Sequence, residues 1–244
     1  MSLYSFFGCL FLAYGPILSI FFLYIARNAQ YVLLMVSSAF FCLIALLISS
    51  VIWYLAKKTQ STHAVTIAYS VAIQEIFRWG FFRILSRAET GLNLVSRNPN
   101  SPFNRPVFGF VSGFGYALMS CLVSYISLLV ESLGPGVKMC QSCPGLSLFF
   151  VSAINTTIFS LLHMAWMMVA FEGFSSYKTK SGMLQITWVI FSHYGASYAT
   201  LFNASDIHLG CVYSALIGVV ILAISCAWIA YGLKSRNYIN RHTN

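Results

Sequence analysis

The chain has 244 residues, of which 59% are hydrophobic and only 8% are charged, and its mean hydropathy is +0.78. Soluble globular domains are about one quarter charged, so this composition excludes an ordinary soluble domain and indicates an integral membrane protein. The formal net charge is +9, from 14 Lys and Arg residues against five Asp and Glu residues. The basic residues lie in short segments between hydrophobic runs, where they set membrane orientation, so we infer no nucleic-acid partner from the charge.

Long hydrophobic runs follow one another along the whole chain. A membrane-spanning helix needs about 20 mostly apolar residues. Seven windows meet this requirement, at residues 3–25, 31–55, 64–85, 107–133, 146–171, 182–203 and 209–232. The first window has no basic segment before it and is longer than a signal-peptide core, so we expect it to be retained. The sequence therefore predicts an all-α integral membrane protein with seven transmembrane helices in a single domain and no soluble domain.

The connections between the windows differ in their basic residues, which predicts the orientation. Cytoplasmic loops of membrane proteins carry an excess of Lys and Arg. One side would hold ten such residues: Arg27, Arg83, Arg87, Arg97, Arg105, Lys178, Lys180, Lys234, Arg236 and Arg241. The other side would hold three: Lys57, Lys58 and Lys138. The asymmetry predicts a lumenal or extracellular N-terminus and a cytosolic C-terminus.

The seven cysteines fall into two groups by position. Five lie in or at the edges of the hydrophobic windows, where cysteine is usually a small packing residue: Cys9, Cys42, Cys121, Cys211 and Cys226. Cys140 and Cys143 form a CxxC motif in a connection assigned to the lumen, which is an oxidising compartment. The motif is compatible with a local disulfide between them, whereas a zinc site would need two further ligands.

The third window carries charged and polar residues among apolar ones. Glu75 and Arg78 are three residues apart and Gln74 and Arg78 are four apart, so all three can meet on one helical face. One interpretation is an internal ion pair that cancels charge, or an arginine that reaches toward the cytosolic interface. The other is a contact with a neighbouring chain. Both interpretations require this helix to face protein.

The fourth window contains a strip of small side chains at intervals of four residues. Gly109, Gly113, Ala117 and Cys121 lie on one helical face, which lets the backbone of another helix approach closely. The strip predicts a packing face. Its partner could be a helix of this chain or of another subunit.

Two histidines lie within hydrophobic windows, and an ionisable residue at that depth is a candidate functional residue. His163 follows Ser160 by three residues and Thr156 by seven, and His193 precedes Ser197 by four, so each histidine belongs to a polar helical face. The simplest interpretation is a pair hydrogen-bonded to neighbouring helices. A metal site, a proton relay and a subunit-docking site are the alternatives.

Catalytic signatures are sparse. Asp206 is the only aspartate, which excludes an aspartyl protease dyad within the chain. The motifs HExxH, GxSxG, GxGxxG and the P-loop are absent from the sequence. A catalytic zinc normally has three protein ligands, and His163 and His193 supply only two. A seven-span zinc-dependent hydrolase using His163 and His193 remains an alternative function, beside a transporter and a seven-span receptor.

Several short runs, in order along nearly the whole chain, resemble the anterior-pharynx-defective (APH) family, a multi-pass subunit of γ-secretase. The runs are Phe6-Phe7-Gly8-Cys9 through Tyr14-Gly15-Pro16, Gln74-Glu75-Ile76-Phe77-Arg78, Leu133-Gly134-Pro135-Gly136-Val137, Leu161-Leu162-His163 with Trp166, and Ser192-His193. The joint order of these runs is what makes the resemblance specific.

The resemblance implies a non-catalytic scaffold that assembles with presenilin, nicastrin and the presenilin-enhancer subunit, needs no cofactor, and supports intramembrane proteolysis of type I membrane proteins such as Notch and amyloid precursor protein. Presenilin would bring both catalytic aspartates. The implied location is the endoplasmic reticulum, the Golgi and the plasma membrane.

The family's intramembrane histidines, tied to subunit assembly, correspond to His163 and His193. Its glycine motif falls on Gly113, Ala117 and Cys121, so this chain replaces the second and third glycines with larger residues. The CxxC motif lies outside the family pattern.

Overall fold

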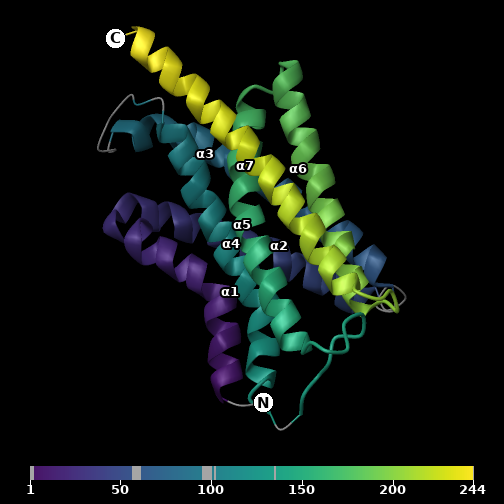
Figure 1. Ribbon diagram of the computed structural model, residues 1–244. Helices are drawn as coiled ribbons and strands as arrows, with labels where there is room; N and C mark the ends of the chain where they lie inside the picture. The colour runs from purple at the N-terminus through teal and green to yellow at the C-terminus, as the bar shows by residue number, and fades with distance from the viewer. Residues whose placement is uncertain (1–2, 57–61, 95–100, 102, 135, 244) are drawn as a thin grey trace.

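A computed structural model describes residues 3–56, 62–94, 101, 103–134 and 136–243, with side chains up to residue 236 (Figure 1). The long helices are α1 (Leu3–Leu23), α2 (Ala29–Leu55), α3 (His63–Leu94), α4 (Asn104–Glu131), α5 (Leu148–Ser175), α6 (Lys180–Ala199) and α7 (Gly210–Thr243). Two short 3-10 helices are η1 (Ile25–Arg27) and η3 (Thr200–Ala204). The all-α architecture is confirmed, with one long helix in each predicted window. Lys57, Lys58, Arg97, Pro135 and the Arg241 side chain lie outside this description.

Five of the helices are long and apolar enough to cross a membrane: α1, α2, α4, α5 and α7. Within the described ranges, α3 and α6 do not reach that composition. Helix α3 carries Glu75 and Arg78, and helix α6 carries His193. The sequence windows therefore predicted seven helices correctly, and the described residues of α3 and α6 differ from the other five in lacking a strongly apolar stretch of spanning length.

Side-chain caps fix where three of the helices begin. The Asn28 side chain accepts a hydrogen bond from the Gln30 amide ahead of α2, and Ser147 accepts one from the Phe150 amide ahead of α5. The Thr179 hydroxyl does the same for the Gly182 amide of α6. Each cap satisfies an amide that has no partner within its own helix, which explains the positions of these starts.

Helix α5 lies at the centre of the bundle and contacts α1, α3, α4, α6 and α7 (Figure 1). Its Leu162, Trp166, Met167 and Ala170 side chains are completely buried. One apolar core fills the space among α1, α2, α4 and α5, and a second lies among α5, α6 and α7. The residues that α5 presents on several sides are therefore internal to the chain.

Helix ends differ from the predicted windows where polar contacts extend or stop a helix. Helix α3 continues beyond residue 85 to Leu94, whose neighbour Leu92 accepts a hydrogen bond from Gln30 Nε2 at 2.8 Å. Glu89, in the same extension, forms a two-pronged ion pair with Arg105, with both contacts at 2.9 Å. By contrast, α6 ends at Ala199, before the end of its predicted window at residue 203, and the chain continues as the more tightly wound 3-10 helix η3.

Candidate functional site

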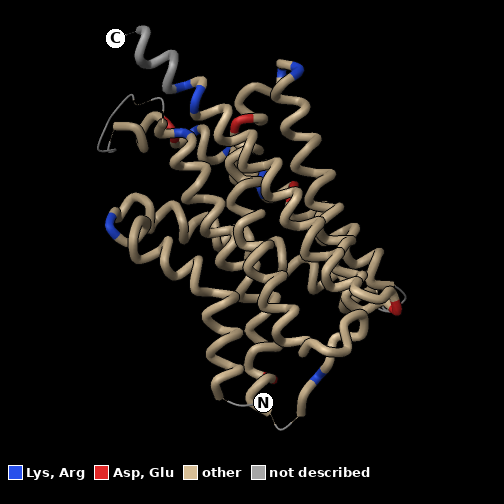
Figure 2. The backbone as a smooth tube through the Cα atoms, viewed as in Figure 1, with Lys and Arg blue, Asp and Glu red and all other residues tan. Residues whose placement is uncertain are grey.

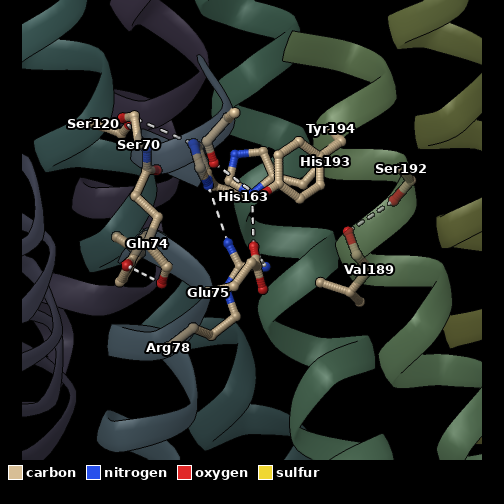
Figure 3. Close-up of polar contacts among 12 residues, drawn as sticks. Ser70, Gln74, Glu75, Arg78, Ser120, His163, Val189, Ser192, His193 and Tyr194 are labelled. Atoms are coloured by element: carbon tan, nitrogen blue, oxygen red, sulfur yellow. Dashed lines mark hydrogen bonds and ion pairs between the residues drawn. The ribbon is translucent and has the colours of Figure 1, made fainter. Parts of the chain in front are cut away.

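A buried ion pair within α3 forms the base of a polar cluster at the middle of the bundle (Figure 3). Arg78 Nη1 lies 3.1 Å from Glu75 Oε1, and the Arg78 side chain is completely buried. Glu75 Oε1 also accepts a hydrogen bond from His193 Nδ1 of α6 at 2.6 Å. Arg78 therefore does not reach toward an interface, and the carboxylate joins α3 to α6.

His163 of α5 extends this cluster toward α4. Arg78 Nη2 lies 3.3 Å from His163 Nδ1, and His163 Nε2 lies 3.2 Å from Ser120 Oγ. A guanidinium only donates hydrogen bonds, so His163 Nδ1 must be the acceptor. The proton of a neutral imidazole then belongs on Nε2, which donates to the Ser120 hydroxyl. One arginine thus fixes the tautomer of this histidine.

Aromatic rings enclose the charged groups. The Arg78 guanidinium carbon lies 5.4 Å from the centre of the Tyr116 ring and 5.9 Å from that of Trp166, within the range of cation–π attraction. The Trp166 ring is tilted against the His193 ring, with 4.5 Å between their centres. The two histidine rings meet edge to face at 5.3 Å. The cluster is therefore a packed unit built from four helices.

Hydroxyl groups connect the same helices through backbone carbonyls. The Tyr116 hydroxyl of α4 donates to the Gln74 carbonyl of α3 at 2.8 Å. From α6, Tyr194 donates to the Ala68 carbonyl of α3 at 2.8 Å. Gln74 Nε2 lies 3.4 Å from Ser70 Oγ within α3. The Tyr116 bond therefore holds α3 beside α4, and the Tyr194 bond holds α3 beside α6.

A cavity of about 530 Å³, lined by both apolar and polar side chains, begins at the cluster and extends toward the α4–α5 and α6–α7 connections. Hydroxyl, amide and imidazole groups dominate its polar lining: Gln74, Ser120, Ser124, Ser152, Asn155, Thr156, His163, His193, Ser197, Thr200 and Asn203. Gln74 Oε1 has no hydrogen-bond partner among the described residues. The two histidines therefore line a cavity whose polar groups can hydrogen-bond to polar molecules.

The predicted strip of small residues on α4 faces α5. A Cβ atom added to Gly113 would lie 2.9 Å from Met164 Cα, closer than real Cβ contacts, and one added to Gly109 would lie 3.5 Å from Met168 Cα. Ala117 is completely buried, and Cys121 Sγ donates to the Thr156 carbonyl of α5 at 3.5 Å. The partner of this strip is therefore an internal helix.

A second close approach on α4 was not part of the predicted strip. Gly115 faces α2, where an added Cβ would collide with the Met35 carbonyl. Three residues further along α2, Ser38 Oγ donates to the Ser112 carbonyl at 2.5 Å. Because Gly113 and Gly115 are two residues apart, they lie on different faces of α4 and admit a helix on each side. The spacing of two residues between Gly113 and Gly115 was the available signal.

The predicted disulfide between Cys140 and Cys143 is corrected by the structure. Cys143 is bonded to Cys211, with 6.2 Å between their Cα atoms, and Cys140 is a free, buried thiol. Cys211 was expected to be only a packing residue. The start of α7 is brought to the CxxC connection by a hydrogen bond from the Leu209 amide to the Ser142 carbonyl at 3.0 Å. The bridge therefore joins segments 68 residues apart.

A metal centre has no basis in the described part of the chain. There, no three His, Cys, Asp or Glu side chains are placed so that they could hold a metal ion. His193 is hydrogen-bonded to Glu75, and both ring nitrogens of His163 have partners in the cluster. The zinc-hydrolase alternative thus receives no support from this geometry.

Three members of the cluster were not identified from the sequence as site residues. Tyr116 and Ser120 lie on the helix of the small-residue strip, and Trp166 is three residues after His163. Polar-tipped side chains inside hydrophobic windows were the available signal. Such side chains usually find a hydrogen-bond partner when buried, but sequence spacing does not reveal which helix supplies it.

Comparison with known proteins gives consistent matches over most of the chain. The profile of one protein family, described as Aph-1 protein, matches residues 4–233. The γ-secretase subunit Aph-1 of Drosophila melanogaster is 34% identical over 209 residues, which cover 85% of each chain. The γ-secretase subunit APH-1B of Homo sapiens is 32% identical over 247 aligned positions, covering 97% of this chain and 92% of the human one. The γ-secretase subunit APH1-like of Arabidopsis thaliana is 29% identical over 224 residues, covering 88% of this chain and 85% of the plant protein.

Proposed function

Because the chain belongs to the Aph-1 family, we propose that it is a non-catalytic subunit of a γ-secretase complex, which cleaves membrane proteins within the bilayer. The relatives are named as γ-secretase subunits, and the alignments extend over most of both chains. The proposed role is that of a scaffold: the chain assembles with presenilin, nicastrin and the presenilin-enhancer subunit and stabilises the complex. The substrates of the complex would be type I membrane proteins such as Notch and amyloid precursor protein.

The observation that carries the non-catalytic role is the closure of the polar cluster on itself. Glu75, Arg78, His163 and His193 are joined to one another and to Ser120. A general acid or base must be within hydrogen-bond reach of a reacting group. Here Glu75 Oε1, His193 Nδ1 and both ring nitrogens of His163 already have partners within the cluster. The only aspartate, Asp206, is exposed in the connection before α7. The catalytic aspartates of the complex would come from presenilin.

We propose that all seven long helices cross the membrane, with the N-terminus lumenal or extracellular and the C-terminus cytosolic, within one domain. Lys and Arg gather toward the end of the bundle that carries the C-terminus, which supports this orientation (Figure 2). The polar composition of α3 is compatible with a span because Glu75 cancels the charge of Arg78 and both face other helices. Endoplasmic reticulum, Golgi and plasma membrane are the proposed locations.

Co-purification from native membranes tests the proposal directly. A tagged chain isolated in mild detergent should bring presenilin, nicastrin and the presenilin-enhancer subunit with it. Recovery of the intact, folded chain without presenilin and nicastrin would refute the proposed role.

Two histidine variants separate assembly from chemistry. His163→Ala and His193→Ala should each lower the yield of assembled complex, because each removes a polar bond between helices, while turnover per assembled complex changes little. His208→Ala is the matched control, since His208 is exposed and outside the cluster. An unchanged yield of complex with abolished turnover would contradict the scaffold role and place chemistry at the histidine pair.

A further inference from the structure

Three cysteines meet where the α4–α5 connection touches the start of α7. Cys140, Cys143 and Cys211 are buried and pack together with Val151. Cys143 and Cys211 share the disulfide, and Cys140 keeps a free thiol. The Ser142 hydroxyl contacts two of the sulfurs, 3.5 Å from Cys140 Sγ and 4.0 Å from Cys143 Sγ. A thiol and a disulfide are therefore buried in one cluster, where a single hydroxyl group contacts a sulfur of each.

We propose that these cysteines form a thiol–disulfide exchange centre that moves the bond from Cys143–Cys211 to Cys140–Cys143. Cys140 gives up its thiol proton, and its sulfur attacks Cys143 Sγ. The new Cys140–Cys143 bond forms as the Cys143–Cys211 bond breaks, and Cys211 leaves as a thiolate that takes up one proton. One disulfide and one thiol are present before and after, so the step needs no oxidant or reductant.

The backbone around the CxxC motif already brings its two ends together. The Cys140 amide donates to the Leu146 carbonyl at 2.9 Å, and the Leu146 amide donates to the Cys143 carbonyl at 2.9 Å. Residues 139 and 147 form an isolated antiparallel bridge that closes the segment between them. Cysteines in a CxxC motif form the disulfides of many redox proteins. The Cys140–Cys143 disulfide can therefore form inside a turn that exists before the exchange.

The segment held by the present disulfide includes a strained residue. Leu209, two residues before Cys211, has a φ of 61°, in the left-handed region that L-residues other than glycine, asparagine and aspartate rarely adopt. Its amide donates to the Ser142 carbonyl at 3.0 Å. Such strain persists only where the surroundings enforce it. Exchange breaks the Cys143–Cys211 disulfide, which is the covalent restraint on this segment, and so favours relaxation of the turn before α7.

Contacts of Cys140 and Ser142 also fix one wall of the cavity that His163 and His193 line. Asn203 of η3 lines the cavity, and its carbonyl accepts hydrogen bonds from Cys140 Sγ at 3.4 Å and from Ser142 Oγ at 3.2 Å. Exchange consumes the Cys140 thiol and so removes the first of these bonds, as well as the tether to α7. The two disulfide isomers therefore differ in how firmly the end of the cavity remote from the histidines is held.

Trypsin separates the isomers because of where the lysines lie. Residues 139–178 contain both Cys140 and Cys143 without an internal Lys or Arg, and residues 181–234 contain Cys211. The structure's disulfide joins these two peptides, whereas the exchanged bond lies inside the first. Exposed Cys226, in the second peptide, is replaced by alanine in all samples so that Cys211 is the one cysteine there.

The full-length protein is incubated in membranes at several ratios of reduced to oxidised glutathione, then unfolded in excess N-ethylmaleimide, digested and mapped by mass spectrometry. We expect both isomers, in a ratio that stays constant as the glutathione ratio changes, because their interconversion is redox-neutral. Total disulfide should fall as the buffer becomes more reducing. Cross-linked peptides alone at every ratio, with no bond inside residues 139–178, would overturn the proposal.

Two variants guard against artefacts of handling. Cys211→Ser should form the Cys140–Cys143 bond quantitatively, and free thiols at both positions under oxidising conditions would also overturn the proposal. Cys140→Ser should show only the cross-linked peptides. Hydrogen–deuterium exchange of residues 200–210 should be faster in Cys211→Ser than in Cys140→Ser, which keeps the tether; equal rates would refute the link to the cavity wall. These readouts do not depend on γ-secretase assembly, so they are independent of the proposed function.

Discussion

The seam between α4 and α5 and the polar cluster hold helices together by opposite means. At the seam, Gly109 and Gly113 lack side chains and let the α5 backbone approach. In the cluster, charged and polar groups of α3, α4, α5 and α6 fill the space between the helices. Both seam helices are among the five most apolar candidates for crossing a membrane, whereas the described residues of α3 and α6 fall below that composition. Close packing of small residues joins α4 to α5, whereas ion pairs and hydrogen bonds tie the less apolar helices α3 and α6 into the bundle.

This contrast predicts different responses to mutation. Helices in a bilayer gain little from hydrophobicity when they associate. Close packing of small residues must therefore provide most of the stabilisation at the seam. A buried ion pair adds little net stability, but removal of one partner leaves a buried charge unpaired and is strongly destabilising. The cluster should therefore be more sensitive to single substitutions than the seam.

Glu75→Gln should have the largest effect. The substitution keeps the side-chain volume but leaves the completely buried Arg78 without a counter-charge. We expect the free energy of unfolding to fall by about 3–5 kcal/mol, the range for breaking a buried pair. Titration with sodium dodecyl sulfate in mixed micelles measures it.

The matched control is Glu131→Gln, which breaks the ion pair with Lys138. Both of those side chains are about half exposed, so the loss should be below about 1 kcal/mol. Equal losses at Glu75 and Glu131 would show that the cluster does not depend on charge pairing.

Gly113→Ala should have an intermediate effect. The added Cβ would lie 2.9 Å from Met164 Cα, and a backbone atom inside a helix cannot move aside alone. Overpacking of this kind costs about 1–3 kcal/mol. Gly80→Ala is the control, because a Cβ there has open space, and it should be neutral or stabilising by up to about 1 kcal/mol. The same unfolding titration compares them, and a neutral Gly113→Ala would mean that α4 and α5 can separate slightly without loss.

Tyr116→Phe should have the smallest effect of the three. It removes one hydroxyl bond, to the Gln74 carbonyl at 2.8 Å, and keeps the ring beside Arg78. Hydrogen bonds between membrane helices contribute about 0.6 kcal/mol on average. The unfolding titration should resolve this loss against Tyr198→Phe, whose hydroxyl bond is at an exposed position. A loss as large as that of Glu75→Gln would place the hydroxyl, and not the ion pair, at the centre of the cluster.

Local patterns were enough to predict much of this architecture. Each hydrophobic run became one helix, because a helix satisfies its backbone hydrogen bonds within the segment itself. The contact between Glu75 and Arg78 followed from a spacing of three residues within one helix. The inward faces of His163 and His193 followed from the same periodicity.

Contacts between distant segments were beyond such patterns. Nothing in the CxxC spacing indicates that Cys143 pairs with Cys211, because that choice depends on how the α4–α5 connection folds against the start of α7. The close approach of α2 at Gly115 likewise depends on the path of a helix from elsewhere in the chain. Helix ends at Leu94 and Ala199 reflect tertiary contacts and a local 3-10 turn.

The pairing of Glu75 with Arg78 inside one helix also bears on how the chain is made. A ribosome completes α3 long before the other partners exist, since 85 residues separate Arg78 from His163 and 118 separate Glu75 from His193. The arginine therefore has its counter-charge from the moment α3 forms. The two histidines arrive later, at an ion pair whose two members are already present in α3.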